Sequence, residues 1–238
     1  MSKENTLSEY AVSVSSTAGG SKYHFNLMNG VGSPDNYTDL LNVLRTSTES
    51  DEINIHINCY GGYLKTAAQL VHNMKLCKGT LIAHLEGECH SSATLIFLAC
   101  DSWVVHDHVT ALFHQYTGGV VGEGHKMRAS LAATDVWVDG LCREYYTNFL
   151  TEEEIQRLNE GIDFYLTSDD IIERLEQYNE ARAEKVEKHE KEEAEYLYEQ
   201  AKLIIASKEK GDDSSNSRSK VDRKSSQKRR IRFLSSRK

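Results

Sequence analysis

The chain has 238 residues, of which 39% are hydrophobic and 27% are charged. This length is enough for one domain with a buried core plus appendages, and the low hydrophobic content indicates that part of the chain lies outside that core. No apolar stretch reaches the roughly 18 residues of a membrane span, and the N-terminal MSKENTLSEY lacks the apolar region of a signal peptide. We therefore expect a cytoplasmic protein rather than a membrane or secreted one.

The net charge of −8 hides two regions of opposite sign. Residues 207–238 hold 12 Lys and Arg against 4 Asp and Glu, whereas the rest of the chain holds 16 basic and 32 acidic residues. The five cysteines include no CxxC pair, which excludes a zinc ribbon and argues against a disulfide framework, so we expect reduced thiols. No cluster of metal-ligand residues occurs either, and we expect no metal or other cofactor.

Apolar periodicity predicts strands and helices that alternate along the chain. The clearest strand is EINIHIN, Glu52–Asn58, in which isoleucine recurs at every second position. Thr80–Leu85 is a nearly continuous apolar run, as expected of a strand buried on both faces. This order calls for an α/β fold of parallel strands joined by right-handed helical crossovers. Further strands are predicted at 21–32, 102–108 and 110–115, and helices within 33–48, 59–79 and 91–100.

The C-terminal half is predicted to be mainly helical. A proline-free helical pattern covers 123–149, and Thr151 with Glu154 forms a capping box that begins a short helix. Residues 162–168 close the compact region. The sequence thus predicts a flexible arm at 1–20, a domain at 21–168, a long exposed charged helix at 169–207, which could form a coiled coil, and a disordered basic tail at 208–238.

Three polar positions follow predicted parallel strands. Ser91 comes after the strand at 80–85 and Gly87, at the entrance to an apolar helix. A serine there is either a helix N-cap or a nucleophile, and in the second case the Ser92 amide is a natural oxyanion donor. The Gly-Gly pair ending at Gly62 and His114 follow two other strands, where a turn and a surface histidine are the simpler interpretations. Parallel strands bring all three positions to one edge of the sheet, where such sheets bind ligands.

The stretch from about Phe25 to Leu166 resembles the ClpP family of serine peptidases, which have a crotonase-like fold. INIHINCYGG is similar to the family's IxxxINSPGG, and EGECHSSATLIFLA to its xGQAASMGAxLLxAG. TALFHQYTGG is similar to xxMIHQPxGG, and LNEGIDFYLTS to xxRDRFLSA. The separations of 29 residues from Gly62 to Ser91 and 49 from His114 to Asp163 are those of the family.

The resemblance implies a serine endopeptidase with a catalytic triad and no cofactor. It assigns Ser91 as the nucleophile, His114 as the general base and Asp163 as the residue that orients the histidine. The amides of Gly62 and Ser92 would bind the tetrahedral oxyanion.

Two alternatives remain beside this assignment. Asp169 or Asp170 replaces Asp163 if the register of the last motif slips. His90 adjoins the nucleophile and either shapes the pocket or is structural.

The family also implies partners. Its members form heptameric rings that pair into a chamber, with the helix at 123–149 between the rings, and an AAA+ unfoldase feeds polypeptide substrates into it. The segment after Leu166 departs from the family and indicates a divergent member of the kind that phages encode, which would act in the host cytoplasm. Two alternatives stay open: a viral capsid-maturation peptidase whose basic tail contacts a shell or nucleic acid, and an inactive regulatory subunit of an active ring.

Overall fold

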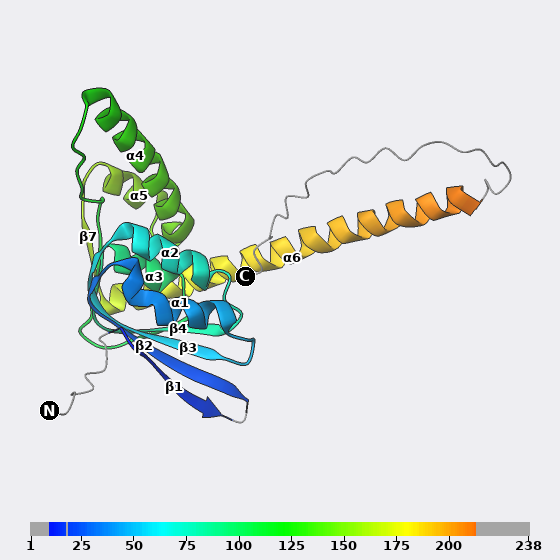
Figure 1. The fold of residues 1–238 in the computed structure, drawn as a ribbon, viewed down its shortest axis with the longest axis horizontal. Coiled ribbons are helices and arrows are strands. Elements are labelled where there is room, and N and C mark those ends of the chain that lie inside the picture. Colours follow the sequence, from blue (N-terminus) through cyan, green and yellow to red (C-terminus); the bar gives the residue numbers. More distant parts are fainter. Residues whose placement is uncertain (1–9, 18, 213–238) are drawn as a thin grey trace. The chain divides into compact units, whose positions relative to one another are not determined.

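The structure is a computed structural model that describes residues 10–17 and 19–212. Its contacts divide the chain into two units, Met1–Tyr178 and Asn179–Lys238. Within the described ranges, no helix combines the length and the apolar character needed to cross a lipid bilayer. The first unit contains the sheet and all of the sequence-predicted site residues, and Figure 1 shows its elements.

A seven-stranded, mostly parallel sheet organises the first unit. The strand order is β1-β2-β3-β4-β6-β7, and β5 pairs with β4 beside β6. The pairs β2–β3, β3–β4, β4–β5 and β4–β6 are parallel, whereas β1–β2 and β6–β7 are antiparallel. The strands are β1 (Val12–Thr17), β2 (Gly20–Val31), β3 (Glu52–Gly62), β4 (Thr80–His90), β5 (Ser102–Val105), β6 (Thr110–Phe113) and β7 (Phe164–Thr167).

Helices cover one face of this sheet because the strands present their apolar side chains to that face. Along β3 the isoleucines at 53, 55 and 57 are fully buried. Figure 1 shows α1, α2 and α3 on one side of the sheet. The predicted α/β class with mostly parallel strands and a long C-terminal helix is thus confirmed. The helices are η1 (Pro34–Tyr37), α1 (Thr38–Thr46), α2 (Leu64–Met74), α3 (Ser92–Leu98), α4 (Gly124–Tyr146), α5 (Glu152–Asn159) and α6 (Ser168–Asp212).

β4 is longer than the apolar run at 80–85 predicted. Its first half pairs with β5 and its second half, Glu88–His90, pairs with β6. Gly87 lies between the two halves, and a β-carbon there would meet the side-chain oxygen of Asn58 at 2.3 Å. The second pairing extends the strand as far as His90, so Ser91 directly follows it.

The structure departs from the predicted boundaries in three places. Residues 12–17, expected in a flexible arm, form β1, which pairs with β2 from Val12 opposite Phe25 to Thr17 opposite Gly20. The predicted extension is not exposed throughout, because Ile171, Leu175 and Tyr178 on the first turns of α6 are buried in the core. That helix also includes residues 208–212 of the predicted tail, and the remainder, 213–238, lies outside the described residues.

The N-terminus of α5 combines the predicted capping box with an ion pair. Thr151 and Glu154 exchange hydrogen bonds of 3.2 and 2.9 Å between side chain and backbone. Two guanidinium nitrogens of Arg174, on α6, donate to the two Glu154 carboxylate oxygens at 2.8 and 2.7 Å. This bidentate contact is the main reason that the pKa of Glu154 falls to about 2. The pair therefore attaches the first turns of α6 to α5.

The variant Glu154→Gln should lower the free energy of unfolding by about 1–2 kcal/mol at pH 7, since the pair is only partly buried. Glutamine still accepts a hydrogen bond from the Thr151 amide, so the change isolates the charge. The pKa is depressed in the folded state, so the contribution is present above the unfolded pKa, near 4.5, and is lost as the pH falls towards 2. Urea denaturation between pH 7 and pH 2.5 measures it.

The matched control is Glu153→Gln, one residue away and exposed, which should change stability little at any pH. If Glu154→Gln lowered the free energy of unfolding by the same amount at every pH in this range, the loss of stability could not be assigned to the ion pair.

Candidate active site

Ser91 has an unusual backbone conformation between β4 and α3. Its φ and ψ are 56° and −129°, a region that costs a residue other than glycine about 1–3 kcal/mol. Ser91 occupies the N-cap position of α3, yet its side chain makes no capping hydrogen bond. The side chain of this half-buried serine therefore does not cap the helix. This removes the main support for interpreting Ser91 as only an N-cap residue.

The end of β3 packs directly against Ser91. A β-carbon on Gly61 would lie 2.5 Å from the Ser91 β-carbon and 2.6 Å from the His90 carbonyl oxygen, so only glycine fits there. Gly61 also has a φ of 92°, and Gly62 has a φ of 151°. A β-carbon on Gly62 would meet the carbonyl oxygen of Val31 at 2.3 Å. Both glycines of the predicted motif are thus required by close contacts, of Gly61 with Ser91 and of Gly62 with Val31.

Strand register brings His114 and Asp163 to the same edge as Ser91. The Ser91 amide donates a 2.8 Å hydrogen bond to the carbonyl of Leu112, in β6. Phe113, the last residue of β6, pairs with Phe164, the first residue of β7. His114 therefore follows β6 at the place where Asp163 precedes β7. The three residues of the predicted triad therefore lie at neighbouring strand ends.

The substitutes for Asp163 lie elsewhere. The carboxylate of Asp170 accepts hydrogen bonds from the amide and hydroxyl of Thr167, at 2.8 and 2.6 Å, and these lower its pKa. Thr167 pairs with Thr110, at the opposite end of β6 from His114, and Asp169 adjoins Asp170. The register thus favours Asp163 over both substitutes.

The predicted triad residues flank neighbouring strands, but their side chains are not joined. His114 is half-buried and Asp163 is exposed. Across residues 10–17 and 19–212, no hydrogen bond links the side chains of Ser91, His114 and Asp163. Catalytic hydrogen bonds are often long in the free enzyme and shorten when substrate binds, so this geometry does not exclude the triad.

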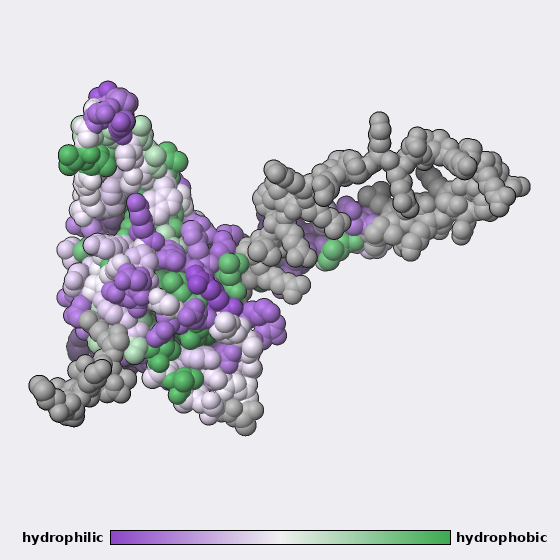
Figure 2. Space-filling view, viewed as in Figure 1, coloured by the Kyte–Doolittle hydropathy of each residue, from purple (hydrophilic) through white to green (hydrophobic). Residues whose placement is uncertain are grey.

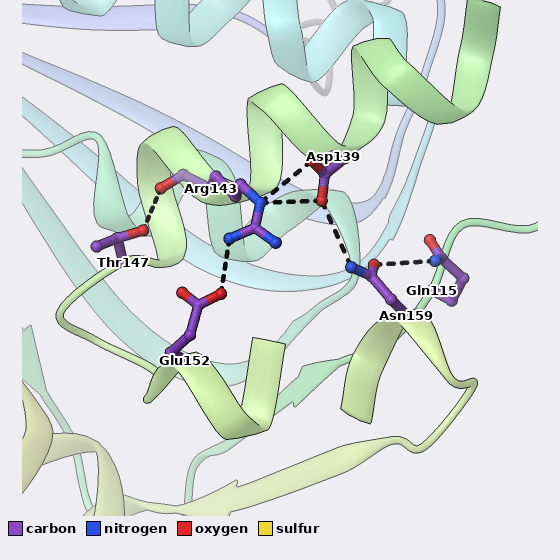
Figure 3. Close-up of polar contacts among 6 residues, drawn as sticks. All are labelled: Gln115, Asp139, Arg143, Thr147, Glu152 and Asn159. Carbon is purple, nitrogen blue, oxygen red and sulfur yellow. Dashed lines mark hydrogen bonds and ion pairs between the residues drawn. The ribbon is translucent and has the colours of Figure 1, made fainter. Parts of the chain in front are cut away.

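Polar contacts attach the segments that carry His114 and Asp163 to α4 (Figure 3). Gln115, next to His114, donates to Asn159 at 3.3 Å, and Asn159 in turn donates to Asp139 at 3.4 Å. Arg143 bonds Asp139 at 3.1 Å and Glu152 at 2.9 Å. All these groups are exposed, so each contact adds at most about 1 kcal/mol.

His90 lies on the strand side of the site. Its Nε2 is 3.0 Å from the Thr110 hydroxyl, and its ring meets that of Tyr165 edge-on at 6.4 Å. Burial is the main cause of a lowered His90 pKa, the Glu88 carboxylate opposes it, and the charge of a protonated His114 adds to it. The two histidines are thus close enough for their charges to interact, although His90 is held by structural contacts.

The amides predicted to bind an oxyanion lie at adjacent strand ends. Gly62 is the last residue of β3, and Ser92 is the first of α3, where helix amides have no partner within the helix. The Ser92 hydroxyl is buried with no hydrogen-bond partner in the described ranges. Nor do those ranges contain a group of three or more His, Cys, Asp or Glu residues placed to hold a metal ion. Backbone amides and side chains at such positions can in general support acyl transfer.

Comparison with known protein families gives a direct match. The family model described as Clp protease matches residues 32–173, more than half of the chain. The chain belongs to the Clp protease family. No curated protein sequence matches it closely. The family match covers all five predicted site residues and supports a ClpP-like peptidase domain in the first unit.

Sequence reasoning missed two residues that contact the site from the core. Thr94, on α3, bonds the carbonyl of Ser91 at 2.6 Å, and its hydroxyl is 2.7 Å from that of Tyr146, on α4. The two residues are 52 positions apart, and nothing in the sequence pattern pairs them. Only the contact of Thr94 with Ser91 was predictable, since a threonine in the first turn of a helix often bonds the carbonyl three residues before it.

The variant Gly61→Ala should lower the free energy of unfolding by at least about 2 kcal/mol, because alanine is strained at this φ and overlaps Ser91. It should also displace Ser91 and abolish its reactivity. Chemical denaturation and labelling with a serine-reactive probe measure the two effects.

Gly140→Ala is the matched control. Gly140 lies within α4, and a β-carbon there meets nothing within 4 Å. The free energy of unfolding of that variant should rise by about 0.5–1 kcal/mol. If Gly61→Ala were as stable as the wild type and were labelled equally fast, the close approach of Gly61 to Ser91 would be contradicted.

Proposed function

We propose that this protein is a serine endopeptidase of the ClpP type, with Ser91 as the nucleophile. The observation that carries the proposal is the strained Ser91 at a strand-to-helix junction, with no capping hydrogen bond from its side chain, beside Gly61 and bonded through its amide to Leu112, two residues before His114. Strained backbone of this kind occurs where surrounding structure holds a functional group in place. Membership of the Clp protease family supports the same chemistry.

In this proposal peptide cleavage proceeds by acyl transfer. His114 accepts the hydroxyl proton as the Ser91 oxygen attacks the scissile carbonyl, and the amides of Gly62 and Ser92 hold the resulting oxyanion. His114 then protonates the departing amine, leaving an acyl-Ser91. Water, deprotonated by His114, releases the second product and restores the serine. Asp163 moves towards His114 and stabilises its charged form.

A fluorophosphonate probe should label the wild-type protein on Ser91 and should not label Ser91→Ala. Peptide hydrolysis should fall by at least about 10³-fold in His114→Ala, because the serine then has no base. Mass spectrometry of the labelled peptide identifies the residue, and a fluorogenic peptide gives the rate.

Asp170→Asn is the control for the orienting carboxylate, and it should retain activity while Asp163→Asn loses it. Equal labelling of wild type and Ser91→Ala would contradict the proposal. Absence of labelling in both would instead favour the inactive regulatory subunit.

Self-assembly into rings forms the second part of the proposal. Large hydrophobic side chains are exposed on α4 and just before it, and Figure 2 shows hydrophobic residues at the surface of this region. Val136 is 76% exposed and Trp137 37%, although both lie on a regular helix. Exposed apolar groups gathered in this way are typical of an interface. A chamber built from such rings admits only unfolded chains, which is the reason to add an AAA+ unfoldase as partner.

The variant Val136→Glu should reduce the native mass, because it places a charge within an apolar contact, while the circular dichroism spectrum stays that of the wild type. Leu76→Glu is the control, since Leu76 is also well exposed, at 62%, but lies beyond the end of α2. Native mass spectrometry or light scattering distinguishes them. An unchanged mass in Val136→Glu would contradict the role of this face.

The capsid-maturation alternative depends on the basic tail at 208–238. Residues 213–238 of it lie outside the described residues, and this alternative stays a prediction.

A further inference from the structure

Three buried groups form a chain of hydrogen bonds from α4 to the proposed nucleophile. The hydroxyl of Tyr146 is 2.7 Å from the Thr94 hydroxyl, which donates to the Ser91 carbonyl oxygen at 2.6 Å. The Thr94 amide donates to the same oxygen at 3.0 Å. Thr94 is fully buried and Tyr146 is 4% exposed. The Ser91 carbonyl thus receives two donors from one buried residue, Thr94.

The direction of each hydrogen bond follows from the number of protons. A carbonyl only accepts, so Thr94 gives its single hydroxyl proton to Ser91. Tyr146 must then be the donor to the Thr94 oxygen. Burial raises the pKa of Tyr146 well above its ordinary value, which keeps this donor protonated. Donor chains of this kind strengthen each member in a low-dielectric interior.

Holding the Ser91 carbonyl also fixes a second group. The carbonyl of Ser91 and the amide of Ser92 belong to one planar peptide unit and point in opposite directions when the peptide is trans. All peptide bonds described are trans. With the oxygen held against Thr94 in the core, the Ser92 N–H is directed away from it. That N–H is the proposed oxyanion donor.

Tyr146 reaches the base-bearing strand as well. Its ring meets the ring of Phe113 edge-on, with centroids 5.0 Å apart and an interplanar angle of 81°. Phe113 directly precedes His114 and is fully buried. Tyr146 therefore contacts the segments that carry the proposed nucleophile and the proposed base.

We propose that Thr94 and Tyr146 are positioning residues that hold the Ser91–Ser92 peptide plane so that the Ser92 amide faces the oxyanion. The inference rests on the proposed function of Ser91. A threonine hydroxyl bonded three residues back is common in a first helical turn. What separates Thr94 from that ordinary role is the strained Ser91 that it supports and the tyrosine that orients its proton.

The decisive variant is Thr94→Val, which keeps the shape and removes the hydroxyl. We expect the fluorophosphonate labelling rate of Ser91 and kcat for a peptide to fall about 10- to 100-fold, with KM unchanged, because the loss arises in the transition state. Thr94→Ser retains the hydroxyl and should recover most of the rate. Tyr146→Phe should show a smaller loss in the same direction.

Thr94→Val leaves the Tyr146 hydroxyl buried without its partner, which costs stability by itself. The double variant Thr94→Val with Tyr146→Phe removes both polar groups and should recover much of the melting temperature. Its labelling rate should remain low. A double variant that recovers both stability and rate, or a Thr94→Ser as slow as Thr94→Val, would overturn the positioning role.

A crystal structure of Thr94→Val separates this inference from the proposed function. We expect the Ser91–Ser92 peptide plane to rotate relative to the wild type, and an unchanged plane would overturn the inference. Failure of the wild type to react with the probe would contradict the proposed function, and with it the catalytic purpose of the positioning, whereas the crystal structure tests by itself whether the Thr94 hydroxyl holds the peptide plane.

Discussion

The close approach of Gly61 to Ser91 is the constraint on which the site depends. The serine lies against the end of β3, and this contact leaves no room for a side chain at position 61. The strain costs about 1–3 kcal/mol, whereas burying a large apolar side chain contributes about 1.5–3 kcal/mol. Four such side chains, Leu95–Leu98, follow directly in α3 and are fully buried. Burial of that helix is therefore sufficient to maintain the conformation.

The remaining groups of the site are held less firmly. The sheet register places His114 and Asp163 next to each other, but side-chain contacts around them are exposed and individually weak. Several of these contacts end on α4, through Asp139 and Arg143. The same helix presents Val136 and Trp137 to solvent and contributes Tyr146 to the core beside Ser91. α4 thus links the proposed assembly surface with the segments that carry the proposed catalytic groups, through intervening residues such as Asn159 and Thr94.

The sequence predicted those parts of the fold that depend on local patterns. The alternating isoleucines of β3 and the apolar run of β4 identified the parallel core, and the Gly-Gly and Ser91 motifs predicted a site at its edge. β1 was missed because it is an edge strand whose Val14 is exposed, so its order comes from backbone pairing rather than from burial. The core contacts of α6 were predictable in principle, since Ile171, Leu175 and Tyr178 recur at helical spacing. The Thr94–Tyr146 pair was not, because it exists only after the chain folds.

The central claim is that Ser91 and the Gly62 and Ser92 amides form one acyl-transfer site. The most direct measurement is a crystal structure of the protein after reaction with a phosphonate probe. The account predicts a phosphorus–oxygen bond to the Ser91 side chain, with a phosphonyl oxygen about 2.7–3.1 Å from both amide nitrogens. An adduct on another residue, or an adduct on Ser91 whose oxygens contact neither amide, would contradict it.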